Sequence, residues 1–217
     1  MKTARALIRP LISSAVLALV MAAAGTGRDP ISVAYLGLFA ALGVATVITR
    51  RQQPVSGEIG DSQGGADPGV RLLGSLLFFA TVVVAAFDFG RFHWGPALPA
   101  AVRIGGLSVM TLFASLQVWA MAANPFFSPS LQVQPGHRLV ARGPYRLLRH
   151  PGYLAMLFTT PATSIALGSL AGLLPALAYE LLILRRTVRE DDFLREKLGG
   201  YAEYAGLVRC RIVPGLW

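Results

Sequence analysis

The chain contains 217 residues, of which 54% are hydrophobic and only 14% are charged, and its mean hydropathy is +0.55. A soluble globular domain carries about 25% charged residues, so this composition excludes an ordinary soluble domain and indicates an integral membrane protein. The net charge of +9 does not indicate a nucleic-acid-binding protein, because the basic residues stand at the ends of apolar runs rather than in one patch. Cys210 is the single cysteine, which excludes an intrachain disulfide and a cysteine-based zinc site.

Six apolar segments approach the length of about 20 residues that a helix needs to cross a bilayer. They are residues 8–25, 31–49, 71–88, 104–123, 153–168 and 169–184. The last two are short and meet at Gly168-Ser169, which predicts a tight helical hairpin. The sequence therefore predicts an all-α fold, a polytopic membrane helical bundle of about six transmembrane helices that forms a single domain over residues 1–217.

The basic residues predict the orientation of the bundle. If the N-terminus is cytoplasmic and the spans alternate, 17 of the 20 Lys and Arg residues fall on the cytoplasmic side, and only Arg28, Arg91 and Arg103 fall on the other. Cytoplasmic loops carry an excess of basic residues, so both termini are expected in the cytoplasm. The brevity of the chain favours a prokaryotic inner membrane.

The first apolar segment has a second interpretation. Lys2, Arg5 and Arg9 precede the apolar run, and Met21-Ala22-Ala23-Ala24-Gly25 ends it with small residues. This order also resembles a cleavable signal peptide, although the run is long enough to span a membrane. Cleavage would leave the sidedness of the remaining segments unchanged.

Two cytoplasmic segments differ in character. Residues 50–70 are polar and rich in glycine, which predicts a flexible loop. Residues 185–198 are charged and amphipathic, which predicts a helical continuation of the last span. Gly199-Gly200 is expected to end this helix, and Tyr201 to begin a short second one. The bundle thus acquires cytoplasmic C-terminal helices.

Residues 143–153 lie between two apolar regions but hold two tyrosines, two arginines and a histidine. Pro144 and Pro151 disfavour helical geometry in the residues before them and remove two backbone donors, so the segment should be a bent, ordered crossing. By residue types alone, an ordinary basic loop at the membrane surface is an equally good interpretation.

Arg186 and Glu190 are four residues apart and share one face of the predicted helix. One interpretation is a surface ion pair, which contributes at most about 1 kcal/mol. The other is a binding face beside residues 143–153. There an arginine can hold an anionic group with two hydrogen bonds, and a carboxylate can hold ribose hydroxyls or an ammonium group.

Several familiar sites are excluded. The chain has no Walker-type phosphate loop and no nucleophile elbow. His93, His137 and His150 are too scattered to predict a metal site. Asp88 and Glu180 are carboxylates in apolar segments, and a structural role is favoured for both: Asp88 facing water at the boundary, and Glu180 pairing internally.

Several motifs follow one another in the C-terminal half of the chain. They are Gly143-Pro144-Tyr145, Arg149-His150-Pro151-Gly152-Tyr153, Arg186 with Glu190-Asp191, and Tyr201, Tyr204 and Val208 before Pro214. This order resembles the isoprenylcysteine carboxyl methyltransferase family, and the phospholipid N-methyltransferases share much of it. The resemblance covers residues 126–217, including Phe127, and reaches more weakly to Asp88 and Trp94. It divides the chain into N-terminal spans (1–125) and a cofactor-binding half (126–217).

The resemblance implies S-adenosylmethionine as the methyl donor and no metal. By position, the residues that would line the cofactor are Gln134, His137, Arg138, Leu139, Val140, Tyr145, His150, Pro151, Gly152, Tyr153 and Glu190. The spacing leaves Gln132 as an alternative to Gln134. Arg186 matches the position that approaches the substrate carboxylate and is the expected catalytic residue.

The function that the resemblance implies is O-methylation of a carboxylate on a small lipophilic, isoprenylcysteine-like acceptor. Such an acceptor is already ionised and needs no general base, whereas an amine would need Glu190 or a water to take a proton. The alternatives are N-methylation of an amine lipid headgroup, a nicotinamide-dependent membrane reductase with a similar C-terminal organisation, and a non-catalytic membrane protein. The expected partners are the lipophilic acceptor and membrane lipids, without nucleic acid, and a monomer is the default oligomeric state.

Overall fold

The computed structural model of the chain describes residues 2–51, 68–128, 133 and 136–213, and every regular element in these ranges is helical. The elements are α1 (Lys2–Ala24), α2 (Pro30–Arg51), α3 (Pro68–Phe87), a π-helical turn η1 (Asp88–Phe92), α4 (Ala100–Ala123), a 3₁₀ turn η2 (Gly143–Arg146), α5 (Pro151–Ala166), α6 (Leu173–Lys197) and α7 (Tyr201–Leu207). The predicted all-α fold is confirmed. Most of the loop expected over residues 50–70 lies outside the described residues.

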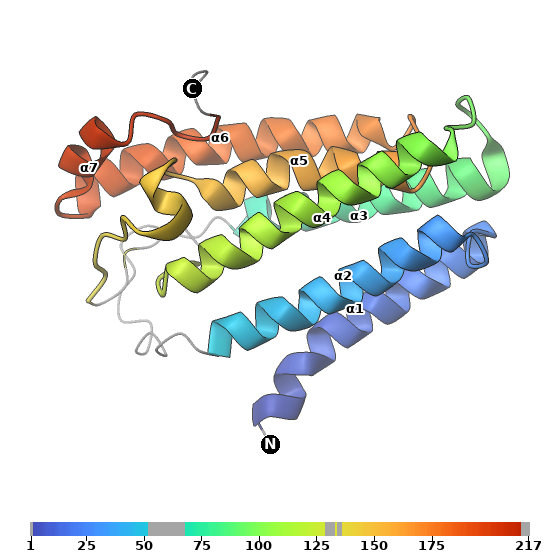
Figure 1. Ribbon diagram of the computed structural model, residues 1–217, viewed down its shortest axis with the longest axis horizontal. Helices are drawn as coiled ribbons and strands as arrows, with labels where there is room; N and C mark the ends of the chain where they lie inside the picture. Colours follow the sequence, from blue (N-terminus) through green and yellow to red (C-terminus); the bar gives the residue numbers. More distant parts are fainter. Residues whose placement is uncertain (1, 52–67, 129–132, 134–135, 214–217) are drawn as a thin grey trace.

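The long helices run side by side in one bundle (Figure 1). α4 packs along α5, α5 packs against α6, and α6 against α3, while α1 and α2 pack on each other and contact α3 and α4. α7 and residues 136–150 lie at the same end of the bundle as the C-terminus of α4 (Figure 1). The chain segments that resemble the methyltransferase motifs are therefore gathered at this end.

In the part of the chain that the structure describes, three helices are long and apolar enough to cross a membrane: Pro30–Arg50, Gly69–Phe92 and Ala100–Ala123. They confirm a membrane helical bundle and contain three of the six expected spans. The apolar part of α1, Pro10–Ala24, is shorter, α5 has 16 residues, and the second half of α6 is charged. The count of six spans and the cytoplasmic placement of both termini remain predictions.

The C-terminal helices follow the sequence pattern closely. α5 and α6 form a hairpin whose turn includes Gly168 at φ +89°, where an added Cβ would lie 2.5 Å from the Phe89 ring. Ser164 Oγ donates to the Ser169 carbonyl oxygen at 2.8 Å and closes the turn. α6 then continues without a break to Lys197, and Gly200 at φ +79° allows the chain to enter α7.

Asp88 has the structural role expected of it, but the surroundings expected for Asp88 and Glu180 are not found among the described residues. Asp88 is only 3% exposed rather than facing water. Its Oδ1 accepts from the backbone N–H of Trp94 at 2.6 Å, and its Oδ2 accepts from Ser169 Oγ at 2.5 Å. Neither carboxylate oxygen of Glu180 has a hydrogen-bond partner among the described residues, so the expected internal pairing is absent there.

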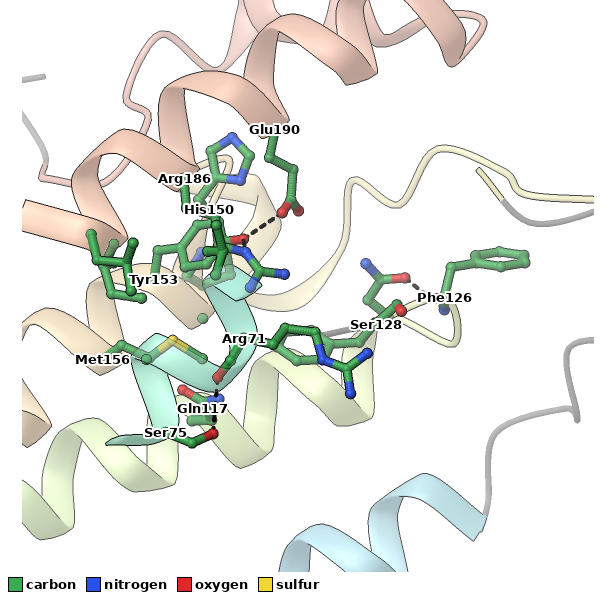
Figure 2. Close-up of a pocket in the computed structure, with 18 of the residues that line it drawn as sticks. Arg71, Ser75, Gln117, Phe126, Ser128, His150, Tyr153, Met156, Arg186 and Glu190 are labelled. Carbon is green, nitrogen blue, oxygen red and sulfur yellow. Dashed lines mark hydrogen bonds between the residues drawn. The ribbon is translucent and has the colours of Figure 1, made fainter. Parts of the chain in front are cut away.

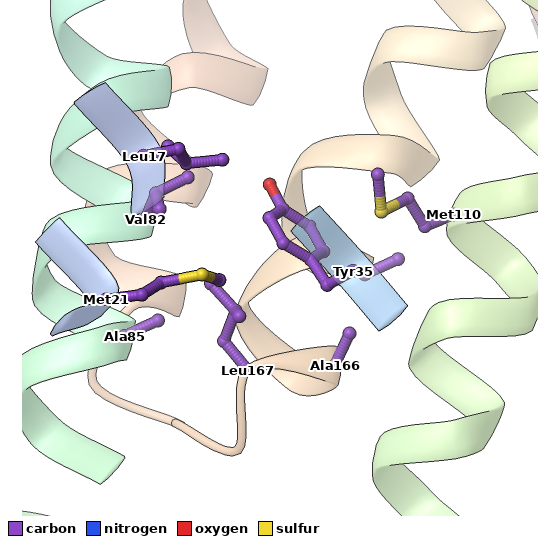
Figure 3. Close-up of a cluster of buried hydrophobic side chains, with 9 residues drawn as sticks. Leu17, Met21, Tyr35, Val82, Ala85, Met110, Ala166 and Leu167 are labelled. Atoms are coloured by element: carbon purple, nitrogen blue, oxygen red, sulfur yellow. The ribbon is translucent and has the colours of Figure 1, made fainter. Parts of the chain in front are cut away.

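A cluster of buried side chains joins the first five helices (Figure 3). Its members are Leu17, Met21, Tyr35, Val82, Ala85, Met110, Ala162, Ala166 and Leu167. Alanines allow helix backbones to approach closely, and methionines fill the irregular gaps that remain. This packed core therefore holds α1 to α5 together.

A buried ion pair joins α4 to the connection between α1 and α2. Arg103 donates to both carboxylate oxygens of Asp29, at 3.1 and 2.5 Å, and its Nε donates to the Ala166 carbonyl oxygen at 3.2 Å. Its guanidinium also lies over the Phe89 ring, 4.0 Å from the centroid. Burial alone would raise the pKa of Asp29, but hydrogen bonds from Arg103 and Ser32 lower it to about 2.

Replacing Asp29 with asparagine is expected to destabilise the protein in a pH-dependent manner. Because the folded pKa is depressed, the stabilisation is complete above about pH 4 and is lost as the pH falls towards about 2. The melting temperatures of wild type and Asp29→Asn in detergent, measured over a pH series, should differ at neutral pH and converge in acid. A difference that is independent of pH would show that the charge of Asp29 is not what stabilises this junction.

Candidate active site

Residues 143–153 form the bent crossing that their prolines predict. η2 covers Gly143–Arg146, and α5 begins at Pro151, whose missing N–H costs nothing at the first helical position. The backbone N–H groups of Arg149 and His150 donate to the carbonyl oxygens of Cys210 and Arg211, each at 2.9 Å. The crossing is therefore held by the C-terminal segment that follows α7.

Asp191 is the centre of a buried charge network at this end of the bundle. Its side chain is fully buried, and all its polar contacts come from elements that are distant in sequence or one helical turn away. The donors to its carboxylate are Arg149 at 2.8 and 3.2 Å, Arg195 at 3.2 Å, Arg211 at 3.0 Å and Tyr201 at 2.8 Å, with His150 Nε2 at 3.2 Å. This single carboxylate thus joins α6, α7, the crossing and the C-terminal segment.

The network fixes the ionisation of its members. Burial would raise the pKa of Asp191, but hydrogen bonds from His150, Arg149 and Tyr201 hold it well below its usual range. Burial first, and then the charge of Asp191, raise the pKa of Tyr201. Asp191 is therefore an anion and Tyr201 a neutral donor throughout the physiological pH range.

Sequence reasoning singled out Glu190 and assigned no role to Asp191. The feature of the sequence that could have indicated a role for Asp191 was Arg149. In the structure, the Arg149 side chain also donates to the carbonyl oxygens of Val208 at 2.8 Å and Arg209 at 3.0 Å. A buried arginine requires an acidic partner, and in the structure that partner is Asp191.

Tyr153 connects the two residues that the sequence placed on one helix face. Its hydroxyl donates to a carboxylate oxygen of Glu190 and accepts from Arg186 Nε at 2.8 Å (Figure 2). The predicted shared face of Arg186 and Glu190 is therefore present, and a tyrosine from the start of α5 links its two charges.

A cavity of about 740 Å³ opens beside this group. Of the residues that the family resemblance implied, those lining it are His137, Leu139, Val140, Tyr145, His150, Pro151, Gly152, Tyr153, Arg186 and Glu190. Arg138 is exposed and does not line the cavity. Gln134 and its alternative Gln132 lie outside the described residues.

His137 presents an unused polar atom in this region. Its ring stacks on Phe126 at a centroid distance of 4.5 Å. Its Nδ1 is buried and has no hydrogen-bond partner among the described residues. Burial lowers the pKa of His137, so the neutral ring is favoured. A ligand in the cavity could supply the missing hydrogen bond, which is a reason for the side chain to be polar here.

Gly152 shapes the wall between α5 and the segment after α4. An added Cβ there would lie 2.9 Å from Cε2 of Phe127, so only glycine permits this close approach. The Phe127 ring itself lines the cavity. Gly152 therefore positions an aromatic ring of the wall without itself contributing a side chain.

The cavity also receives residues from the N-terminal helices, which the division of the chain at residue 125 did not anticipate. Arg71 and Ser75 of α3 and Gln117 of α4 line it together with Met156 of α5 (Figure 2). The signal for Gln117 was its place in an apolar span, since polar residues at membrane depth commonly face an interior cavity.

Comparisons with known proteins agree with the motif pattern. Two rice proteins, each described as a probable protein-S-isoprenylcysteine O-methyltransferase, from Oryza sativa subsp. indica and subsp. japonica, are each 38% identical to this chain over 74 residues. The aligned stretch covers 32% of this chain and spans 37% of the length of each relative. Residues 106–196, which contain the crossing, α5 and nearly all of α6, match the isoprenylcysteine carboxyl methyltransferase (ICMT) family, so the resemblance predicted from the sequence is confirmed over this part of the chain.

Proposed function

We propose that the protein is an S-adenosylmethionine-dependent membrane methyltransferase that O-methylates a carboxylate on a lipophilic acceptor. One observation carries the proposal. Residues from His137 to Glu190, separated by more than fifty positions, line a single cavity at one end of a membrane helical bundle. The same residues fall within the stretch that matches the ICMT family.

The residues at the polar end of the cavity fit the chemistry of S-adenosylmethionine. Glu190 can accept hydrogen bonds from ribose hydroxyls, and the unpartnered Nδ1 of His137 can bond to the purine. Tyr145 and Tyr153 offer aromatic surface, which attracts a cationic sulfonium. The cavity volume of about 740 Å³ lies within the 300–1,000 Å³ common for small-molecule sites. When bound, the cofactor supplies an electrophilic methyl group.

The chain's own contribution is positioning and exclusion of water. Arg186 can orient an acceptor carboxylate, and its contact with Tyr153 restrains the guanidinium against the cavity wall. A carboxylate acceptor is already ionised and requires no proton transfer. The carboxylate of Glu190 is occupied by the Tyr153 hydroxyl, which favours a binding role for it over that of a general base.

Tyr153 acts as a positioning residue in this proposal. Tyr153→Phe keeps the ring but removes the hydroxyl between Arg186 and Glu190, so the folded state should be retained while both side chains lose a restraint. We expect kcat to fall roughly tenfold and the KM for S-adenosylmethionine to rise several-fold, the loss expected of one or two charge-assisted hydrogen bonds. Steady-state kinetics together with a melting curve test this, and unchanged kinetics would exclude a positioning role.

The experiment that separates the proposal from its main rival is a binding measurement. Detergent-purified protein is titrated with labelled S-adenosylmethionine and, in parallel, with NADPH. Saturable binding of S-adenosylmethionine alone supports a methyltransferase. Binding of NADPH alone would support a membrane reductase, and binding of neither would favour a non-catalytic role.

A further inference from the structure

The cavity extends well beyond the polar residues around Glu190. Along α6 it is lined from Glu190 back to Tyr179, a separation of 11 residues, which corresponds to about 16 Å of helix. Along α3 it is lined from Val70 to Phe79. The space therefore extends from the Glu190 region into the part of the bundle where helices are apolar enough to cross a membrane.

This inner part of the cavity, here termed the apolar arm, is walled mainly by hydrocarbon and aromatic side chains. They are Ile12, Val16, Leu17, Phe39, Phe78, Phe79, Met156, Leu182 and Ile183. Ser13, Ser75 and Gln117 also line the cavity, and the hydroxyl of Ser75 donates to the Arg71 carbonyl oxygen at 3.0 Å. An apolar occupant would therefore be favoured over a polar one.

One end of the apolar arm meets the buried core cluster. Leu17 lines the cavity and belongs to that cluster (Figure 3). Phe39 and Phe78 line the cavity and pack against the cluster. The rings of Phe39 and Phe78 stack with centroids 6.3 Å apart, and Phe39 stacks in turn on Tyr35 at 6.4 Å. Because packed interiors yield little, these side chains set a limit to how far an occupant can extend.

We propose that the apolar arm holds the hydrocarbon tail of the methyl acceptor and that Phe39 and Phe78 set the longest tail the protein accepts. This inference rests on the proposed methyltransferase function, because it places the acceptor's reactive group at Arg186 and its tail in the continuous space below. The tail is selected by α1, α2 and α3, which lie outside the stretch that matches the ICMT family. The N-terminal helices thus determine acceptor selectivity, and the C-terminal half provides the reaction centre.

Gly74 offers a way to shorten the arm without disturbing its floor. It lines the cavity on α3, and a Cβ added there would lie 3.6 Å from both Leu182 and Tyr179, an ordinary contact distance. The Cβ of a leucine at this position would not clash with its neighbours, and the rest of the side chain would fill space in the apolar arm. Gly105 on α4 is the matched control, because nothing lies within 4 Å of its added Cβ and it does not line the cavity.

The test uses full-length protein and S-geranyl-, S-farnesyl- and S-geranylgeranyl-cysteine, which differ only in tail length. The measured quantity is kcat/KM for the longest acceptor divided by kcat/KM for the shortest. Phe78→Ala should raise this ratio by roughly tenfold, because it adds space for several carbons. Gly74→Leu should lower the ratio by a similar factor, because it removes such space. Leu76→Ala, on the lipid-facing side of α3 at 55% exposure, and Gly105→Leu should leave the ratio unchanged.

Direct binding of a radiolabelled set of the same acceptors separates the two hypotheses. If wild type binds them with a tail-length preference that Phe78→Ala and Gly74→Leu shift, but transfers no methyl group, the apolar arm is supported and the proposed function fails. If wild type methylates them and neither variant changes the tail preference in binding or turnover, the proposed function stands and the apolar arm is overturned. Should Phe78→Ala not fold, Gly74→Leu alone decides. Absence of any binding would also overturn the apolar arm.

Discussion

Replacing Asp191 with asparagine is expected to lower the free energy of unfolding by about 3–5 kcal/mol, the cost of leaving buried cations without their counter-charge. Arg149 would lose the negative charge opposite it and one of its two acceptor oxygens, because an amide offers a single oxygen, at a position where its side chain is 3% exposed. For a chain of this size the loss corresponds to a fall of roughly 10 °C in melting temperature. Thermal unfolding in detergent, followed by circular dichroism, measures it.

The adjacent residue provides the control for this prediction. Asp192 has the same side chain on the same helix but is exposed, so Asp192→Asn should change stability by no more than about 0.5 kcal/mol. Asp191→Asn should also weaken ligand binding, because a neutral amide holds His150 and Tyr201 beside the cavity less strongly than the carboxylate does. Equal melting temperatures for the two variants would contradict the role given to Asp191.

Replacement of Glu190 by alanine and replacement of Arg186 by alanine are expected to impair different steps, namely cofactor binding and methyl transfer. Glu190→Ala removes a carboxylate that can hold the cofactor's hydroxyls, so the Kd for S-adenosylmethionine should rise roughly ten- to a hundredfold. Arg186→Ala removes the group that orients the acceptor, so kcat should fall roughly a hundredfold with cofactor binding largely retained. Equilibrium binding and single-turnover methyl transfer separate the two effects.

The control for this pair is Arg189→Ala, because Arg189 lies between the two residues in sequence but is exposed on α6 and does not line the cavity. It should bind cofactor and turn over like wild type. If Glu190→Ala and Arg186→Ala also behave like wild type with an acceptor that the protein methylates, the site has been assigned to the wrong residues.

Much of the fold could be predicted from the sequence because its elements are set by local signals. Apolar runs of helix length marked α2, α3 and α4, and two prolines marked the turn and restart at residues 143–153. Gly199-Gly200 marked the break before α7. The number of spans could not be decided in the same way, because α5 is short and α6 changes from apolar to charged along its length.

The site could be predicted only in part because its contacts join distant segments. The order of the motifs in the sequence predicted His150, Tyr153 and Glu190 as site residues, and these three residues line one cavity. Nothing local indicated that Asp191 would be fully buried among several donors, since its neighbours on the helix are charged and all its partners except Arg195 lie in other elements. The contribution of α1 to α3 was missed because apolar cavity walls and lipid-facing surfaces have the same residue types.

Methyl transfer to a carboxylate can be tested directly. A carboxyl methyl ester is hydrolysed in alkali, so the test measures whether the labelled product is stable in base. Purified protein is incubated with methyl-labelled S-adenosylmethionine and S-farnesylcysteine or a lipid extract, and the lipophilic product is treated with alkali. We expect label that alkali releases as methanol, as a carboxyl methyl ester requires, and we expect Arg186→Ala to abolish nearly all of it. Label that enters the lipid phase but resists alkali would show N-methylation of an amine, and no labelled product from any acceptor would contradict methyltransferase activity.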